Sequence, residues 1–130
     1  MPRKKNILLI DPAPAASYMI TMILKLNNFD VMPYSDPELA FSDFQKGAYD
    51  LILVDLEMKG INGFELYERI RQIDDKVSVC FMTVLREKHL NEFKSSFPTF
   101  PSTKLVEKPV GTEDLLEILR LNLGDSEYPC

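Results

Sequence analysis

Four side chains that can do chemistry stand at the ends of short apolar runs in this 130-residue chain. They are two carboxylates, a hydroxyl and an ammonium, on Asp11, Asp55, Thr83 and Lys108. Carboxylates coordinate hard divalent cations, and an ammonium neutralises an anionic group beside it. One such residue alone is weak evidence, because strand ends are commonly polar. The four together become specific if the fold brings them to one place.

Asp55 lies in the most informative stretch of the chain, LILVDLEMKG from Leu51 to Gly60. Four aliphatic residues lead into the acid, and such a run is typical of a strand buried on both faces in a parallel sheet. Open α/β sheets place their ligand and reaction sites at the carboxyl edge, where this strand would end. On this stretch alone, Asp55 could equally cap the turn that follows it.

The rest of the chain alternates between apolar runs and segments with helical spacing. The predicted strands cover residues 6–10, 29–34, 51–55, 77–83 and 104–106. The predicted helices cover residues 14–28, 37–47, 63–74, 86–96 and 113–123. We expect N-caps at Asp36, Asn62 and Thr112, with Gly47 ending the second helix. Helical spacing predicts one apolar face on the first helix, with Ala15, Met19, Met22, Ile23 and Leu26, and one on the last, with Leu115, Ile118, Leu119 and Leu123.

Five strands alternating with five helices predict an α/β fold, a single doubly wound (βα)5 domain with a parallel sheet and helices on both faces. We expect this domain to span residues 1–124, followed by a C-terminal tail at 125–130. Because parallel strands point the same way, their carboxyl ends meet at one edge. The fold therefore predicts that Asp11, Asp55, Thr83 and Lys108 converge.

Composition narrows the possible functions. The chain has 15 basic and 20 acidic residues, a net charge of −5 and a pI near 4.9, with no basic cluster beyond Arg3 to Lys5. Direct nucleic-acid binding is disfavoured, because neutralising phosphates needs a basic face. We expect neither a signal sequence nor membrane insertion. The two cysteines, Cys80 and Cys130, have no ligand-spaced partners and suggest a reduced, cytoplasmic protein. The single histidine, His89, fits a surface helix position.

From about Asn6 to Leu123 the sequence resembles the receiver (CheY-like) domain of two-component response regulators. The matching segments are ILLID at 7–11, LILVDLEMKGING at 51–63, FMT at 81–83 and EKP at 107–109. The resemblance implies a flavodoxin-like sheet with strand order 2-1-3-4-5. It also implies a phosphoprotein rather than an enzyme, one that assists its own phosphorylation and dephosphorylation.

The resemblance assigns a role to each of the converging residues. Asp55 would accept a phosphoryl group from the phosphohistidine of a sensor kinase. Mg²⁺ would be held by Asp11, by the Asp55 carboxylate and by the backbone carbonyl of Glu57. Thr83 and Lys108 would bond the phosphoryl oxygens, and the peptide between Lys108 and Pro109 is expected to be cis. Such a site is physically sensible, because a carboxylate attacks an anionic phosphoryl group only where positive charge offsets the repulsion.

The acidic pair after the first strand departs from the family pattern. Two adjacent acids are usual there, whereas this chain has Asp11 followed by Pro12. The second acid usually ligates the metal directly, and proline offers no ligand atom. We therefore predict weaker Mg²⁺ binding and slower phosphorylation. A shifted loop would let Asp11 coordinate the metal directly, an alternative that the sequence leaves open.

Three further departures bear on loops and signalling. Lys59 stands where the family usually has proline, which changes the stiffness of the loop after Asp55. Val84 replaces a small residue and predicts narrower access to Asp55. Leu105 replaces the usual switch tyrosine or phenylalanine, so coupling through a threonine and an aromatic ring is not available in its usual form.

Two other functions remain open beside the phosphoacceptor. The first is a receiver-like module that works through protein contacts without phosphorylation. The second is a small aspartate-nucleophile phosphatase, suggested by Asp55 with Glu57 two residues on. It is disfavoured because that nucleophile belongs on a first strand and 130 residues leave no room for a cap domain. FMN or dinucleotide binding is disfavoured too, as no Gly-rich loop follows the first strand.

The expected partners follow from the length of the chain. With no output domain in 130 residues, we expect a stand-alone receiver that signals through protein contacts. Its partners would be a sensor histidine kinase or phosphotransfer protein and a downstream protein target. A homodimer is possible through the face made by the fourth helix, the fifth strand and the last helix. Leu105, Leu116, Leu121 and the loop at residues 97–101 are candidates for an apolar patch there, although Leu116 and Leu121 could equally be packed under neighbours.

Overall fold

A computed structural model describes residues 4–83, 95, 105–108 and 111–123. Its sheet has the order β2-β1-β3-β4-β5, and every neighbouring pair is parallel. The strands are β1 (Asn6–Ile10), β2 (Asp30–Tyr34), β3 (Leu51–Asp55), β4 (Ser78–Thr83) and β5 (Leu105–Glu107). All five residues of β3 are buried, as a central strand with helices on both sides requires. The predicted fold class and strand order are confirmed.

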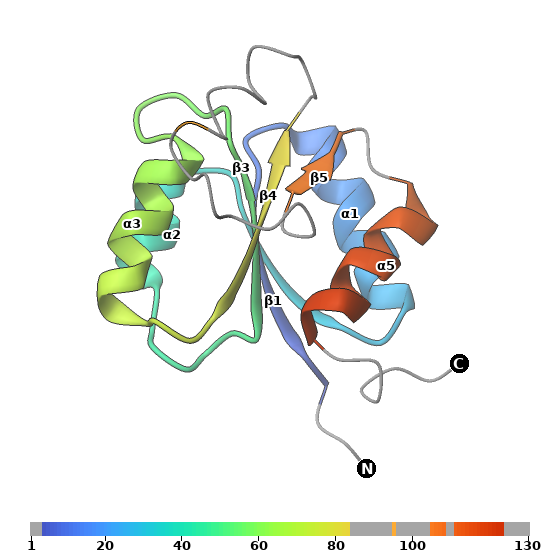
Figure 1. Cartoon of the computed structure of the whole chain (residues 1–130). Coiled ribbons are helices and arrows are strands. Elements are labelled where there is room, and N and C mark those ends of the chain that lie inside the picture. The colour runs from blue at the N-terminus through green and yellow to red at the C-terminus, as the bar shows by residue number, and fades with distance from the viewer. Residues whose placement is uncertain (1–3, 84–94, 96–104, 109–110, 124–130) are drawn as a thin grey trace.

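The helices lie in two layers, one on each face of the sheet (Figure 1). They are α1 (Pro14–Leu26), α2 (Pro37–Asp43), α3 (Gly63–Ile73) and α5 (Thr112–Leu123). Leu8 and Ile10 of β1 pack in the cluster that includes α2 and α3, while Ile7 and Leu9 pack in the cluster with α1 and α5. The two cores thus take alternate residues of the same strand, as the alternation of side chains along a strand requires.

The predicted apolar face of α1 is wrong except at Ile23, which packs against the cluster on that side of the sheet. The buried residues of α1 are Ile20 and Leu24, whereas Met19, Met22 and Leu26 are exposed by 59, 42 and 79%. The helix carries apolar residues on most of its circumference, so helical spacing alone does not choose the side that faces the sheet. Packing in the cluster with Leu9 and Leu115 decides the orientation.

Helix α2 is shorter than the sequence predicts and ends at Asp43 instead of residue 47. Phe44 already has an extended backbone, with φ −65° and ψ 134°. This conformation accompanies burial of its ring, which stacks on Tyr49 with centroids 6.0 Å apart. Gly47 has a positive φ of 81° and lies in the loop rather than at the helix end.

Two of the three predicted N-caps are confirmed. The Asp36 side chain accepts from the N–H of Glu38, and Asn62 forms a reciprocal capping box with Glu65. Thr112 is instead the first helical residue of α5. Gly111 precedes it, and its carbonyl accepts the first helical hydrogen bond from the N–H of Leu115 at 2.9 Å. The predicted inner face of α5 is confirmed, with Leu115 and Leu119 buried and Ile118 and Leu123 packed beside them.

Asp74 secures the edge of the sheet opposite the carboxyl ends. It is buried, and its carboxylate accepts N–H bonds from Gly47, Lys76 and Val77 at 2.9–3.1 Å. Burial alone would raise the pKa of Asp74, but these three donors outweigh it and the pKa is lowered. Asp74 therefore ties the loop after α2 to the start of β4.

Several predictions fall outside the described residues. They concern the helix at 86–96 with His89, the access residue Val84, the loop at 97–101, the cis peptide at Pro109 and the tail at 125–130. On the predicted dimer face, Leu121 is 54% exposed and Leu116 packs on the core, and the dimer itself stays a prediction. Among the described residues, no helix has the length and apolarity needed to cross a bilayer.

Candidate functional site

The sheet brings four strand ends to one edge. Asp11 directly follows β1, Asp55 and Thr83 are the last residues of β3 and β4, and Lys108 directly follows β5. The register keeps these ends level, because Ile10 pairs with Val54, Asp55 with Met82 and Thr83 with Glu107. The backbone N–H of Lys108 also donates to the Thr83 carbonyl at 2.8 Å.

Lys108 joins the two carboxylates. Its Nζ donates to Asp11 Oδ2 at 2.8 Å and to Asp55 Oδ2 at 3.4 Å. Asp11 is 0% exposed and Asp55 is 7% exposed, so both acids lie largely out of water. One ammonium thus bridges two buried carboxylates contributed by β1 and β3, and the arrangement concentrates charge at the carboxyl edge.

Backbone contacts orient Asp11. Its N–H donates to the Tyr34 carbonyl at 3.0 Å, and its Oδ1 accepts from the N–H of Ala13 at 2.9 Å. The carboxylate therefore closes an Asx turn with one oxygen and meets Lys108 with the other. Pro12 lies within this turn and is exposed.

Thr83 is buried, and its hydroxyl donates to Glu57 Oε1 at 3.5 Å, the long limit for a hydrogen bond. The sequence assigns Glu57 a backbone carbonyl for the metal and, in the phosphatase alternative, a second acid, but it predicts no contact with Thr83. Its side chain is exposed on the loop after β3, and no sequence pattern sets the direction of such a loop side chain. The structure thus adds a carboxylate next to Thr83.

Burial and neighbouring charges shift two pKa values at the site. Burial is the largest influence on the pKa of Asp55 and raises it. The Lys108 ammonium lowers this pKa and the Asp11 carboxylate raises it, and the net result is a pKa above the ordinary aspartate value. Burial lowers the pKa of Lys108, but the carboxylates of Asp11 and Asp55 more than offset this and the pKa is raised. Lys108 therefore stays protonated at neutral pH, and the charged form of Asp55 is held at a free-energy cost.

The donor set at this edge fits a magnesium ion in chemistry. Asp11 and Asp55 offer hard carboxylate oxygens that already share one cation, and Mg²⁺ in proteins commonly keeps several waters beside one or two carboxylates. Pro12 adds no ligand atom. The described part of the chain holds no group of three or more His, Cys, Asp or Glu side chains suited to a metal. Asp11 and Asp55 are thus two carboxylates at this edge whose chemistry suits Mg²⁺.

Restoring an acid at position 12 is expected to tighten Mg²⁺ binding. Pro12→Asp adds a third carboxylate, and about 1.4 kcal/mol of extra attraction already gives tenfold tighter binding. We expect a gain of about tenfold or more, measured by calorimetric titration with MgCl₂. Pro12→Ala is the control, since it removes the ring without adding charge. Equal affinity in the wild type and in Pro12→Asp would contradict a metal site beside Asp11.

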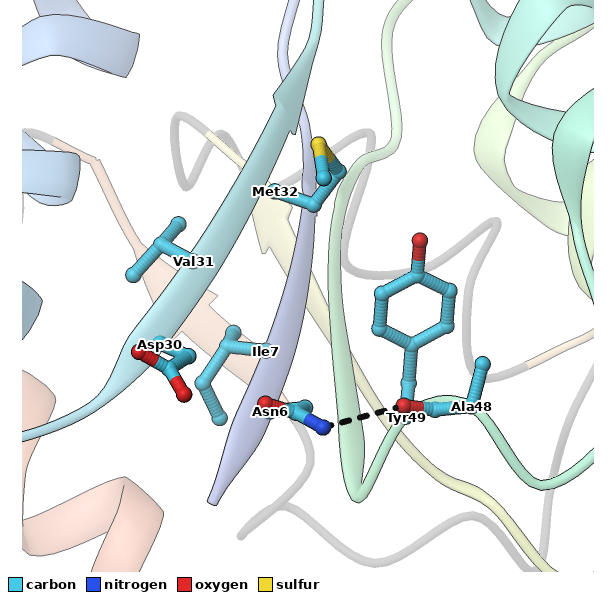
Figure 2. A pocket seen from close by; sticks show the side chains of 7 residues that line it. All are labelled: Asn6, Ile7, Asp30, Val31, Met32, Ala48 and Tyr49. Atoms are coloured by element: carbon cyan, nitrogen blue, oxygen red, sulfur yellow. Dashed lines mark hydrogen bonds between the residues drawn. The ribbon is translucent and has the colours of Figure 1, made fainter. Parts of the chain in front are cut away.

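A cavity among the described residues lies at the opposite edge of the sheet (Figure 2). It has a volume of about 260 Å³ and is lined by Asn6, Ile7, Asp30, Val31, Met32, Ala48 and Tyr49. Asn6 and Asp30 begin β1 and β2, and the Asn6 side-chain amide donates to the Ala48 carbonyl at 3.3 Å. The four converging residues do not line it, so their chemistry takes place elsewhere.

Comparison with known proteins supports one family. The model of the response regulator receiver domain matches residues 7–120. The transcriptional regulatory protein TrcR of Mycobacterium tuberculosis is 26% identical over 95% of this chain and 47% of TrcR. RprY of Bacteroides fragilis, also a transcriptional regulatory protein, is 27% identical over 88% of this chain and 48% of RprY. The chain thus spans about half the length of these two relatives.

A solved structure agrees at the level of the fold. The chemotaxis protein CheY4 of Vibrio cholerae superposes with a TM-score of 0.79 at 20% identity, covering 93% of this chain and all of CheY4. A TM-score of this size at such low identity indicates a shared fold. With a family match over residues 7–120 and the same fold, this chain belongs to the response regulator receiver domain family.

Proposed function

We propose that this chain accepts a phosphoryl group on Asp55, from the phosphohistidine of a sensor histidine kinase or a phosphotransfer protein, and signals through protein contacts. Receiver domains interact with such donors and with downstream targets. The observation that carries the proposal is the Lys108 ammonium, bonded to two buried carboxylates at the carboxyl edge. The stand-alone state and the cytoplasmic location stay predictions.

The chemistry is a transfer between two nucleophiles. An Asp55 oxygen forms the new bond to phosphorus as the bond from phosphorus to the donor imidazole nitrogen breaks. The imidazole keeps the electron pair and takes up a proton. The obstacle is repulsion between the carboxylate and the anionic phosphoryl group, and Lys108, 3.4 Å from Asp55 Oδ2, offsets part of it.

Once Asp55 is phosphorylated, its neighbours meet a new anion in place of the carboxylate. Lys108 would bond a phosphoryl oxygen while keeping its contact with Asp11. The Thr83 hydroxyl would turn from Glu57 to donate to another phosphoryl oxygen. This exchange of hydrogen bonds alters the loop after β3 and the end of β4, which is how the signal would leave the site.

Magnesium would take part in the charge balance. Receiver domains typically bind Mg²⁺, and the bound ion would neutralise the phosphoryl oxygens during transfer. In this chain Asp11, the Asp55 carboxylate and the Glu57 carbonyl would hold it. Because Pro12 replaces an acid, we expect the wild type to need a higher Mg²⁺ concentration than a site with both acids.

A small acyl phosphate tests the proposal without knowledge of the natural donor. With acetyl phosphate and Mg²⁺ we expect intact mass spectrometry to show the gain of one phosphoryl group. EDTA should suppress the gain. If no mass shift and no fluoroberyllate-dependent spectral change occurs, the alternative holds, a receiver-like module that works by contacts alone. Pro12 is the observation that favours this alternative.

A further inference from the structure

Gly63, the first residue of α3, lies against the backbone of the residue that we propose as phosphoacceptor. A Cβ atom built on Gly63 would be 2.6 Å from the carbonyl oxygen of Asp55, 3.0 Å from Leu56 Cα and 3.2 Å from the Asp55 carbonyl carbon. Contacts below about 3 Å do not occur between unstrained carbon and oxygen atoms. The neighbours are backbone atoms, which cannot turn aside as a flexible side chain can.

Position 63 needs glycine because the neighbouring backbone leaves no room for a Cβ atom, and not because of its backbone conformation. Gly47 and Gly60 have positive φ values, of 81° and 84°, and nothing within 4 Å of a built Cβ. Gly63 has an ordinary helical backbone that any residue adopts, and what it lacks is room. The sequence therefore keeps α3 in direct contact with the end of β3.

Hydrogen bonds make this contact rigid. The N–H of Gly63 donates to the Leu56 carbonyl at 3.1 Å, and the N–H of Leu56 donates to the Met82 carbonyl at 2.9 Å. Strand β4 thus holds the peptide between Asp55 and Leu56, and the start of α3 holds the next peptide, between Leu56 and Glu57. A push on the Asp55 carbonyl would pass directly to the Asp55 side chain and, through Leu56, to Glu57.

We propose that Gly63 is a positioning residue for phosphoryl transfer, an inference that rests on the proposed role of Asp55. The absent side chain lets the start of α3 seat the Asp55 peptide so that the carboxylate reaches Lys108 at 3.4 Å with Asp11 opposite. A methyl group at position 63 would move the Asp55 peptide, although none of the side chains of the site is itself substituted.

Gly63→Ala is the direct test. A misplacement of about 1 Å can cost a reaction about a hundredfold in rate, so we expect acetyl phosphate to phosphorylate this variant about ten to a hundred times more slowly. The rates are compared at saturating Mg²⁺ and well below the melting temperature of each variant. If Gly63→Ala unfolds, trimethylamine N-oxide, which favours the folded state, is added to all samples and rates are taken per folded molecule.

Two control variants separate positioning from stability. Asn62→Ala removes the capping box at the same helix start, which costs about 1 kcal/mol, but crowds nothing. Gly111→Ala adds a methyl group before α5, where the nearest atom, Asp114 Oδ2, is an ordinary 3.6 Å away. Both should keep rates near the wild type. An equal loss in Asn62→Ala and Gly63→Ala, or a wild-type rate in Gly63→Ala, would overturn the inference.

A second readout does not depend on phosphorylation. Amide NMR shifts of Leu56 and Glu57 and the ammonium signal of Lys108 should change in Gly63→Ala and stay in place in Gly111→Ala. If the wild type takes no phosphoryl group, the proposed function fails, and these shifts still decide the role of Gly63. Unchanged shifts in Gly63→Ala would refute it.

Discussion

An Asp55→Asn variant is expected to take up no phosphoryl group from acetyl phosphate and to unfold at a higher urea concentration than the wild type at pH 7. The first effect follows because an amide is neither charged nor nucleophilic enough to attack phosphorus. The second follows from burial beside Asp11, which holds the pKa of Asp55 above its ordinary value even with Lys108 in contact. The ionised carboxylate is thus a net cost to the fold, and asparagine removes this cost with nearly the same shape.

The pH dependence gives this prediction its sign. A carboxyl group with a raised pKa in the folded state stabilises the protein at low pH and loses that contribution as pH rises through the folded pKa. The advantage of Asp55→Asn should therefore grow from about pH 4, the ordinary aspartate value, toward neutral pH and then level off. Asp30→Asn, an exposed acid at the opposite edge, is the control and should still be phosphorylated. If the wild type is more stable than Asp55→Asn at pH 7, the ionised Asp55 carboxylate does not destabilise the fold, and this account is contradicted.

A Lys108→Met variant is expected to lose about 3–5 kcal/mol of the free energy of unfolding at pH 7, because it leaves two buried carboxylates without their cation. Methionine keeps the length and apolar bulk of the side chain, so packing changes little. Phosphorylation should also fall by about a hundredfold or more, as the charge that offsets the repulsion between Asp55 and the phosphoryl group is gone. Urea unfolding and the acetyl phosphate assay measure the two effects.

The stability loss should shrink as pH falls, because protonation of Asp55 relieves the repulsion between the carboxylates. In the wild type the raised pKa of Lys108 means that its contribution is complete below about pH 10 and is lost only as pH rises through the folded pKa. Lys59→Met, which removes an exposed charge on the loop after β3, is the matched control. A loss within about 0.5 kcal/mol, as for ordinary surface changes, would show that Lys108 does not hold the acids together.

The positions of the strands were predictable because their apolar runs end at polar residues. Leu51 to Asp55 is the best case, since a strand covered on both faces needs an uninterrupted apolar run, and β3 is buried throughout. The meeting of Asp11 and Asp55 at Lys108 follows from the same topology, because residues 97 and 53 positions apart come together when parallel strands end at one edge.

Other features depend on packing that periodicity does not encode. Helix α1 is apolar on most sides, so the choice of Ile20 over Met19 for the core is made by the neighbouring elements. The early end of α2 comes with burial of Phe44 against Tyr49, a contact between residues on either side of a loop. The close approach of Gly63 to Asp55 likewise has no local signal, as a glycine after an N-cap is compatible with ordinary helix initiation.

The most direct test of the central claim is to locate the phosphoryl group. After treatment with acetyl phosphate and Mg²⁺, borohydride reduces an aspartyl phosphate to homoserine, which peptide mass spectrometry assigns to one position. We predict homoserine at position 55 and unmodified aspartate at position 11. Homoserine at Asp11, or at neither residue in a fully folded sample, would contradict the assignment of Asp55 as the phosphoacceptor.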